Sequence, residues 1–246
     1  VGLVIGPVGY FIRSNLTETS AFLESRAAAP TTGDLGSVVA AHAKQALVTM
    51  GIITSGTISF YVILLYIPTF ARTQLHLPLD DAFIAQAISL AFLVVLTPLF
   101  GALSDRVGRK PIMIGALVLY LALTYPLFRW LHANPSFANL AIVQIVLCSL
   151  LGIFFGPMST ALAEQFPART RSTSLGIAYN LAVMIFGGFA QFFVTWLIQA
   201  TGSPIAPAFY VMFGAGVGLL AACFLIERAR DVSLPVFDTA ADAEAA

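Results

Sequence analysis

Charged residues are scarce in this chain. They make up 10% of the 246 residues, whereas hydrophobic residues make up 59%. A soluble domain carries about 25% charged residues, so the composition excludes an ordinary soluble protein and indicates an integral membrane protein. The sequence also lacks the alternation over about ten residues that barrel strands show. The formal net charge is zero, which argues against a nucleic-acid-binding surface.

Cysteine and histidine are few as well. Cys148 and Cys223 both lie inside apolar runs, so they indicate neither a disulfide framework nor a metal site. His42, His76 and His132 are scattered through polar segments and lack metal-ligand spacing. The sequence shows no Ser/His/Asp grouping and no phosphate-binding loop, so we predict neither enzymatic activity nor a cofactor.

Long apolar runs are abundant, and six of them are long enough to cross a bilayer of about 30 Å. The predicted spans are residues 47–70, 82–100, 111–128, 138–162, 174–199 and 207–226. Residues 1–12 are apolar but too short to cross, and we interpret them as the end of a truncated helix rather than a signal peptide. We interpret residues 13–46 as a polar linker on the cytoplasmic side, 47–226 as a six-helix bundle and 227–246 as a disordered cytoplasmic tail.

Lysine and arginine are distributed unequally between the two sides that these spans define. Only Arg72 and Arg129 lie on one side, and the other ten of the twelve lie on the opposite side. Cytoplasmic loops carry the excess of Lys and Arg, so we expect the richer side, and with it the C-terminus, to be cytoplasmic.

Charge is absent from the interiors of all six predicted spans. A charge at the bilayer centre costs at least ~2.5–3.5 kcal/mol on insertion scales, so a buried charge would have marked a functional site. Uncharged polar side chains are the remaining candidates for a substrate cavity, and they are Ser55, Ser59, Tyr66, Gln86, Gln144, Asn180 and Gln191. The alternative is helix packing, because Ser and Thr can bond their own backbone and a buried amide can bridge two helices.

One polar stretch, residues 101–110, reads GALSDRVGRK and lies between two apolar runs. We expect a short loop that joins two antiparallel spans, in which Gly101 and Gly108 allow close backbone approach and positive φ. Asp105 is expected near the start of the next helix, where a carboxylate is favourable, and Pro111 at the first helical position. The cations expected to hold this loop in the cytoplasm are Arg106, Arg109 and Lys110.

The order Gly-x-x-Ser-Asp-Arg-x-Gly-Arg-Lys closely resembles the loop signature of the major facilitator superfamily of secondary transporters. Two further stretches resemble its metabolite:proton symporters, which include citrate, oxoglutarate and proline/betaine carriers. They are residues 7–22 (PVGYFIRSNLTETSAF) and 164–188 (EQFPARTRSTSLGIAYNLAVMIFGG). Ser20 and Gln191 stand where that group usually or often has Pro, so we expect a straighter helix around Gln191.

The resemblance implies an all-α membrane protein that corresponds to part of helix six and to helices seven to twelve, the C-terminal half of a twelve-helix carrier. It implies alternating access, in which two halves rock around a central site lined by helices seven, eight, ten and eleven. The implied function is proton-coupled symport of an organic acid, such as a tri- or dicarboxylate, across the inner membrane. The implied cytoplasmic gating loop consists of Gly101, Asp105, Arg106, Gly108, Arg109 and Lys110.

The implied partners are a small organic anion, protons, the lipid bilayer and an N-terminal half, with no nucleic acid. The spans hold no charge, so the proton-carrying and substrate-pairing groups are expected in that other half. Uptake of another metabolite, such as proline, betaine or a sugar-like compound, is an open alternative. A seven-helix receptor or a channel subunit is a further one, but the signature loop has no role in such receptors.

Overall fold

The computed structural model describes residue 11 and residues 43–166 and 171–226. Within these residues every regular element is helical, and six helical segments are long and apolar enough to cross a membrane. The elements, with η marking π-helices, are α4 (Ala43–Phe60), η1 (Tyr61–Tyr66), α5 (Ile67–Thr73), α6 (Leu79–Val107), α7 (Arg109–Ala133), α8 (Phe137–Ala163), α9 (Arg171–Ala182), η2 (Val183–Gly187), α10 (Ala190–Thr201) and α11 (Ala206–Cys223). The predicted fold class and number of complete spans are confirmed.

The helices extend beyond the predicted spans, because polar residues continue several of them past the apolar runs. The segment α4–η1–α5 begins at Ala43, so the last residues of the predicted linker 13–46 are helical. Apart from Phe11, the rest of that linker and the predicted helix end at residues 1–12 lie outside the described residues. The predicted tail, residues 227–246, lies outside them as well.

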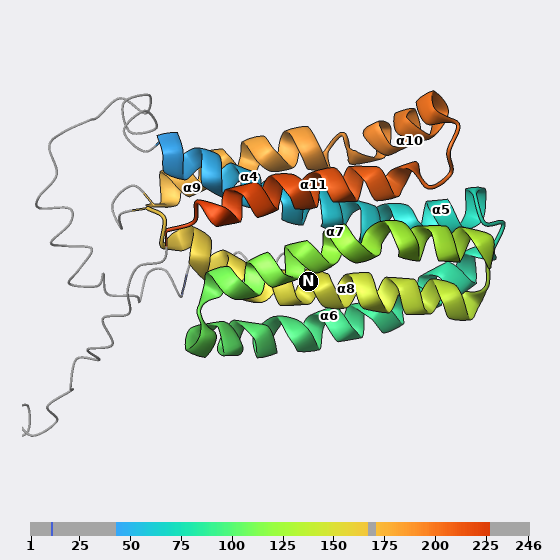
Figure 1. Cartoon of the computed structure of the whole chain (residues 1–246), viewed down its shortest axis with the longest axis horizontal. Coiled ribbons are helices and arrows are strands. Elements are labelled where there is room, and N and C mark those ends of the chain that lie inside the picture. The colour runs from blue at the N-terminus through green and yellow to red at the C-terminus, as the bar shows by residue number, and fades with distance from the viewer. Residues whose placement is uncertain (1–10, 12–42, 167–170, 227–246) are drawn as a thin grey trace, which may run out of the picture.

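The helices form two groups that lie side by side in Figure 1, with α4, α9 and α11 along one side and α6, α7 and α8 along the other. α11 contacts both α4 and α7 and so joins the groups. Two bundle ends are named here by a residue: the Gly108 end, where α6 passes into α7, and the Arg72 end, where α5 finishes.

Glycines set the closest helix contacts. A Cβ added at Gly156 of α8 would lie 2.6 Å from the backbone nitrogen of Gly101 in α6, and one at Gly152 would lie 3.1 Å from the carbonyl oxygen of Leu93. At Gly218 of α11, an added Cβ would lie 2.4 Å from the Cβ of Ser55 in α4. Small residues at four-residue spacing thus allow these backbones to approach, as in other membrane helices.

The predicted polar loop at residues 101–110 is wrong in its extent. α6 continues to Val107 and α7 begins at Arg109, so Gly108 alone joins the two helices, at φ 105° and ψ 152°. The expected positive φ at Gly108 is confirmed, and only glycine adopts this conformation without strain. Asp105 therefore lies in the last turn of α6 rather than near the next helix start, and Pro111 is the third residue of α7 rather than the first.

Candidate functional site

Two of the six spanning segments change from α- to π-helix partway along their length. η1 interrupts the segment between α4 and α5, and η2 interrupts the segment between α9 and α10. π-Helical turns are rare and occur frequently at functional sites. The two interruptions lie next to each other, because a Cβ added at Gly187 of η2 would lie 2.8 Å from Cγ2 of Thr57 and 2.9 Å from the ring of Tyr61.

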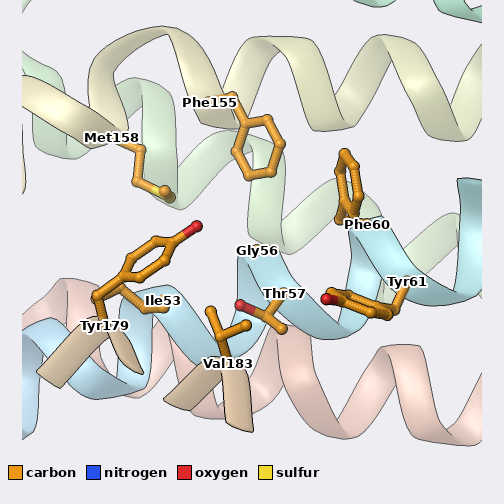
Figure 2. A pocket seen from close by; sticks show the side chains of 9 residues that line it. All are labelled: Ile53, Gly56, Thr57, Phe60, Tyr61, Phe155, Met158, Tyr179 and Val183. Atoms are coloured by element: carbon orange, nitrogen blue, oxygen red, sulfur yellow. The ribbon is translucent and has the colours of Figure 1, made fainter. Parts of the chain in front are cut away.

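A cavity of about 220 Å³ lies beside this contact and is lined by residues of α4, η1, α8, α9 and η2 (Figure 2). In Figure 2 the ring of Tyr179 extends across the cavity toward Met158 and Phe155. The lining residues are Ile53, Gly56, Thr57, Phe60, Tyr61, Phe155, Met158, Tyr179 and Val183. We call this space the aromatic cavity.

The aromatic cavity offers hydroxyl groups and ring surfaces but none of its nine lining residues is charged. Thr57, Tyr61 and Tyr179 supply the hydroxyls. The ring of Phe60 lies 6.4 Å from that of Phe155 and 5.9 Å from that of Tyr61, between ring centroids. Such a lining can donate hydrogen bonds and present π-faces, but it cannot neutralise an ion.

A second cavity, of about 490 Å³, lies toward the Arg72 end between η1, α5 and α6. Arg72 contributes a guanidinium to it, Thr69 and Thr73 contribute hydroxyls, and Gln86 contributes an amide. The hydroxyl of Thr73 already donates to the carbonyl oxygen of Thr69 at 2.8 Å. We call this space the Arg72 cavity.

The three predicted cavity residues of the first span do not line the aromatic cavity. Ser55, Ser59 and Tyr66 are all buried, and Ser55 packs against Gly218 of α11. Ser55 thus lies in the contact between α4 and α11, because the face of α4 that carries Ser55 packs against Gly218 of α11. The α4 residues that line the aromatic cavity are instead Ile53, Gly56, Thr57 and Phe60.

The four predicted amides do not line one common cavity. Gln86 lines the Arg72 cavity, and Gln144 is fully buried within the bundle. Asn180 and Gln191 are exposed, and the Asn180 amide donates to the Gly176 carbonyl oxygen of its own helix at 2.7 Å. The substrate-binding role of all seven stays a prediction, but the structure does not bring them together in one cavity.

The helix around Gln191 is not straight. After η2, residues Gly188 and Phe189 form a turn, and α10 begins at Ala190. The π-helix and turn coincide with the Phe-Gly-Gly sequence at residues 186–188 and not with position 191. Gly187 lies at this point because it packs directly on Thr57 and Tyr61. Two adjacent glycines were the signal from which this break could have been inferred.

At the Gly108 end, Arg109 joins three helices through ion pairs. Its guanidinium lies 3.6 Å from the carboxylate of Asp105 in α6 and also pairs with Glu164, at the end of α8. Arg109 is 19% exposed and Asp105 is 67% exposed, so the cation is enclosed while one carboxylate reaches the surface. The pairing of Glu164 was not predicted from the sequence, although Glu164 is the first residue of the Glu-x-Phe-Pro motif.

Lys110 adds a connection from this end to α11. Its ammonium donates to the carbonyl oxygens of Cys223 at 2.7 Å and Leu225 at 3.3 Å. Carbonyl groups at a helix C-terminus lack partners within the helix, and a cation there is favourable. Gly101, expected in the gating loop, instead lies in the contact of α6 with α8. We call Asp105, Arg109, Lys110 and Glu164 the charge cluster.

Comparison with known proteins identifies the family. The Major Facilitator Superfamily matches residues 37–243. The chain belongs to the Major Facilitator Superfamily. It is a multi-pass membrane protein, and the described residues contain six spanning helices.

Individual relatives are similar over most of this chain. It is 33% identical to the citrate-proton symporter of Salmonella typhi over 93% of its length, and 33% identical to that of Klebsiella pneumoniae over 92%. It is 29% identical over 96% to the ectoine/proline transporter ProP of Corynebacterium glutamicum. These matches cover 52%, 51% and 49% of the relatives, so the chain spans about half their length.

The resemblance seen in the sequence implies that the described spans correspond to helices seven to twelve. With the described segments numbered seven to twelve, the aromatic cavity lies among helices seven, ten and eleven, which are three of the four expected cavity helices. α6, the equivalent of helix eight, lines the Arg72 cavity instead.

Proposed function

We propose that this chain is the C-terminal half of a secondary active transporter that couples the uptake of an organic acid, such as a tri- or dicarboxylate, to protons. The supporting observation is the aromatic cavity at two adjoining helix interruptions, in a chain similar to citrate-proton symporters. Secondary transporters bind substrates near the bilayer midplane, where helices are discontinuous. Transport by alternating access, rather than catalysis, is the proposed activity.

Because the lining of the aromatic cavity is neutral, the charged groups that transport of an organic acid requires must come from another part of the carrier. Burying a carboxylate without a partner charge costs several kcal/mol. This half supplies hydroxyl donors from Thr57, Tyr61 and Tyr179 and an apolar wall. We propose that an N-terminal half supplies the substrate-pairing cation and the proton-carrying group, and that the two together form the carrier.

The charge cluster is proposed to act as a gate at the cytoplasmic mouth of this carrier in the inner membrane. Arg109 holds α6, α7 and α8 together, and Asp105 presents most of its carboxylate at the surface of the same end. A contact from the other half can compete for that carboxylate only when the halves approach. Closing and opening of this end would then make and release ion pairs without touching the aromatic cavity.

The transport proposal is tested in vesicles that contain the complete carrier, with the outside acidified. Citrate, or a related di- or tricarboxylate, should accumulate and should leave when an uncoupler collapses the proton gradient. The matched control is the same vesicle preparation without an imposed gradient. Failure of all such acids to accumulate would contradict the proposal.

The proposed orientation is tested with single cysteines in a background without Cys148 and Cys223. A cysteine at His76 or His132 should react with an impermeant thiol reagent outside intact cells, whereas one at Val107 should react only after the membrane is opened. The opposite pattern would place the charge cluster outside the cell.

The aromatic cavity favours a second substrate class, zwitterions with a quaternary or cyclic ammonium group. Phe60, Tyr61, Phe155 and Tyr179 are four of its nine lining residues, and an aromatic face attracts such a cation by about 0.5–2 kcal/mol. Glycine betaine or proline should then compete with, or replace, the organic acid in the same vesicles. Accumulation of citrate unaffected by excess betaine would exclude this alternative.

A further inference from the structure

The contact between α6 and α8 follows a regular register. Gly156 lies against Gly101 and Thr97, and Gly152 lies against Leu93 and Leu96. One turn farther toward the Arg72 end, the side chains of Cys148 and Ser89 lie close to each other, while the Ser89 hydroxyl donates to the carbonyl oxygen of Gln86 at 2.8 Å. Each step of four residues along α8 thus matches a step of about four along α6, and the two helices run in the same direction.

The next turn of both helices carries an amide. Gln144 precedes Cys148 by four residues, and Gln86 precedes Ser89 by three, so each amide shares a face with the contact one turn away. The register therefore places Gln144 and Gln86 at one level between α6 and α8.

α7 places the hydroxyl of Thr124 near the same level, as the contact of its neighbour Tyr120 with α8 indicates. The phenol of Tyr120 donates to the carbonyl oxygen of Leu147 in α8 at 2.6 Å. α7 runs opposite to α8, so the residue one turn on from Tyr120, Thr124, lies near the turn of α8 that holds Gln144. Thr124 and Gln144 are both fully buried.

These three side chains share an unusual property. Within the described residues, seven buried side-chain atoms have no hydrogen-bond partner. One of them, Arg109 Nη1, is ion-paired with Glu164, and four of the others are Gln86 Oε1, Gln144 Oε1, Gln144 Nε2 and Thr124 Oγ1. A buried polar atom without a partner costs about 1–3 kcal/mol. Because the helix registers place the three side chains at one level around α8, a single shared ligand can satisfy these four atoms.

We propose that Gln86, Gln144 and Thr124 form a binding site for water inside the α6–α7–α8 group, separate from the aromatic cavity. Water suits the site because both donors and acceptors there need partners, and a buried water makes about three hydrogen bonds. A metal cation would leave the Gln144 amide donor unsatisfied. Gln86 also lines the Arg72 cavity, which connects the site to the Arg72 end, where the guanidinium disfavours cations.

The test is X-ray radiolytic footprinting of the whole purified chain, because hydroxyl radicals formed from bound water oxidise the nearest sulfur. Cys148 lies next to the proposed site, and Met113 of α7 is an equally buried sulfur about 16 Å from Thr124 along the helix. After division by its rate in the denatured chain, oxidation of Cys148 should be severalfold faster than that of Met113. Equal normalised rates would overturn the proposal.

A variant identifies the source of the radicals. Gln144→Leu should lower Cys148 oxidation to the level of Met113, with Thr124→Val serving if the first variant does not fold. Fast oxidation of Cys148 that persists in a folded variant would also overturn the site. The measurement requires neither transport nor the N-terminal half, so its outcome is independent of the proposed function.

Discussion

Two pairs of neighbouring spans pack against each other in different ways. One pair is α6 and α8, and the other is α4–η1–α5 and α9–η2–α10. All four segments cross the bundle, but α6 and α8 remain single α-helices despite Pro98 and Pro157. The other two segments pass through π-helices where they meet, and the aromatic cavity lies there. The difference teaches that regular packing through small residues holds α6 and α8 close together, whereas the interrupted segments, together with α8, leave a cavity between them.

The scaffold should be most sensitive at Gly156. In Gly156→Ala the new Cβ would lie 2.6 Å from Gly101 N and 2.7 Å from Thr97 O, and backbone atoms cannot move aside without separating the helices. We expect a loss of about 1–3 kcal/mol, measured as a lower unfolding temperature in detergent. Gly115→Ala is the matched control, because nothing lies within 4 Å of its added Cβ. Similar melting of both variants would refute the role of this contact.

The interrupted segments should respond differently at Gly187. In Gly187→Ala the new Cβ meets side-chain atoms of Thr57 and Tyr61, which can shift into the aromatic cavity. We expect a stability loss of about 1 kcal/mol but a clear rise in the Michaelis constant of the complete carrier. Gly176→Ala, with open space around its Cβ, should leave both quantities unchanged. A Gly187→Ala carrier with normal kinetics would separate the aromatic cavity from substrate binding.

The charge cluster should affect rate more than stability. Asp105 is largely exposed, so Asp105→Asn should change the free energy of unfolding by less than about 1 kcal/mol. Transport by the complete carrier should nevertheless slow strongly, with little change in equilibrium substrate affinity, because the gate loses an ion pair. Asp81→Asn, at the Arg72 end, serves as the control. A large loss of affinity at unchanged turnover would move Asp105 from the gate to the substrate site.

The smallest stability effect is expected at Asn180. Its amide bonds its own helix and is exposed, so Asn180→Ala should alter the unfolding temperature little. If the side chain contacts substrate, the Michaelis constant should rise further in Asn180→Leu than in Asn180→Ala. Unchanged transport together with lower stability would support a packing role.

Much of the architecture could be predicted from the sequence, because the length of an apolar run depends only on residues that are close together in the chain. The six spans and the positive φ at Gly108 follow from residues close in sequence. The cavity residues could not be predicted in the same way, since Ser55 and Thr57 are equally polar and only α11 decides which of them is covered. Pro68, the second residue after η1, and the glycines at the end of η2 were the available signals for the interruptions.

The sequence by itself determined that this is a membrane-spanning chain of the Major Facilitator Superfamily, because a bilayer admits few charges and requires helices of a minimum length. The order of residues 101–110 was enough to suggest that family. Only the tertiary structure decided which polar groups meet. Glu164 pairs with Arg109, and Gly218 covers Ser55, through the register and rotation of the helices. These depend on contacts between residues far apart in sequence, where a single missing Cβ sets the distance between two backbones.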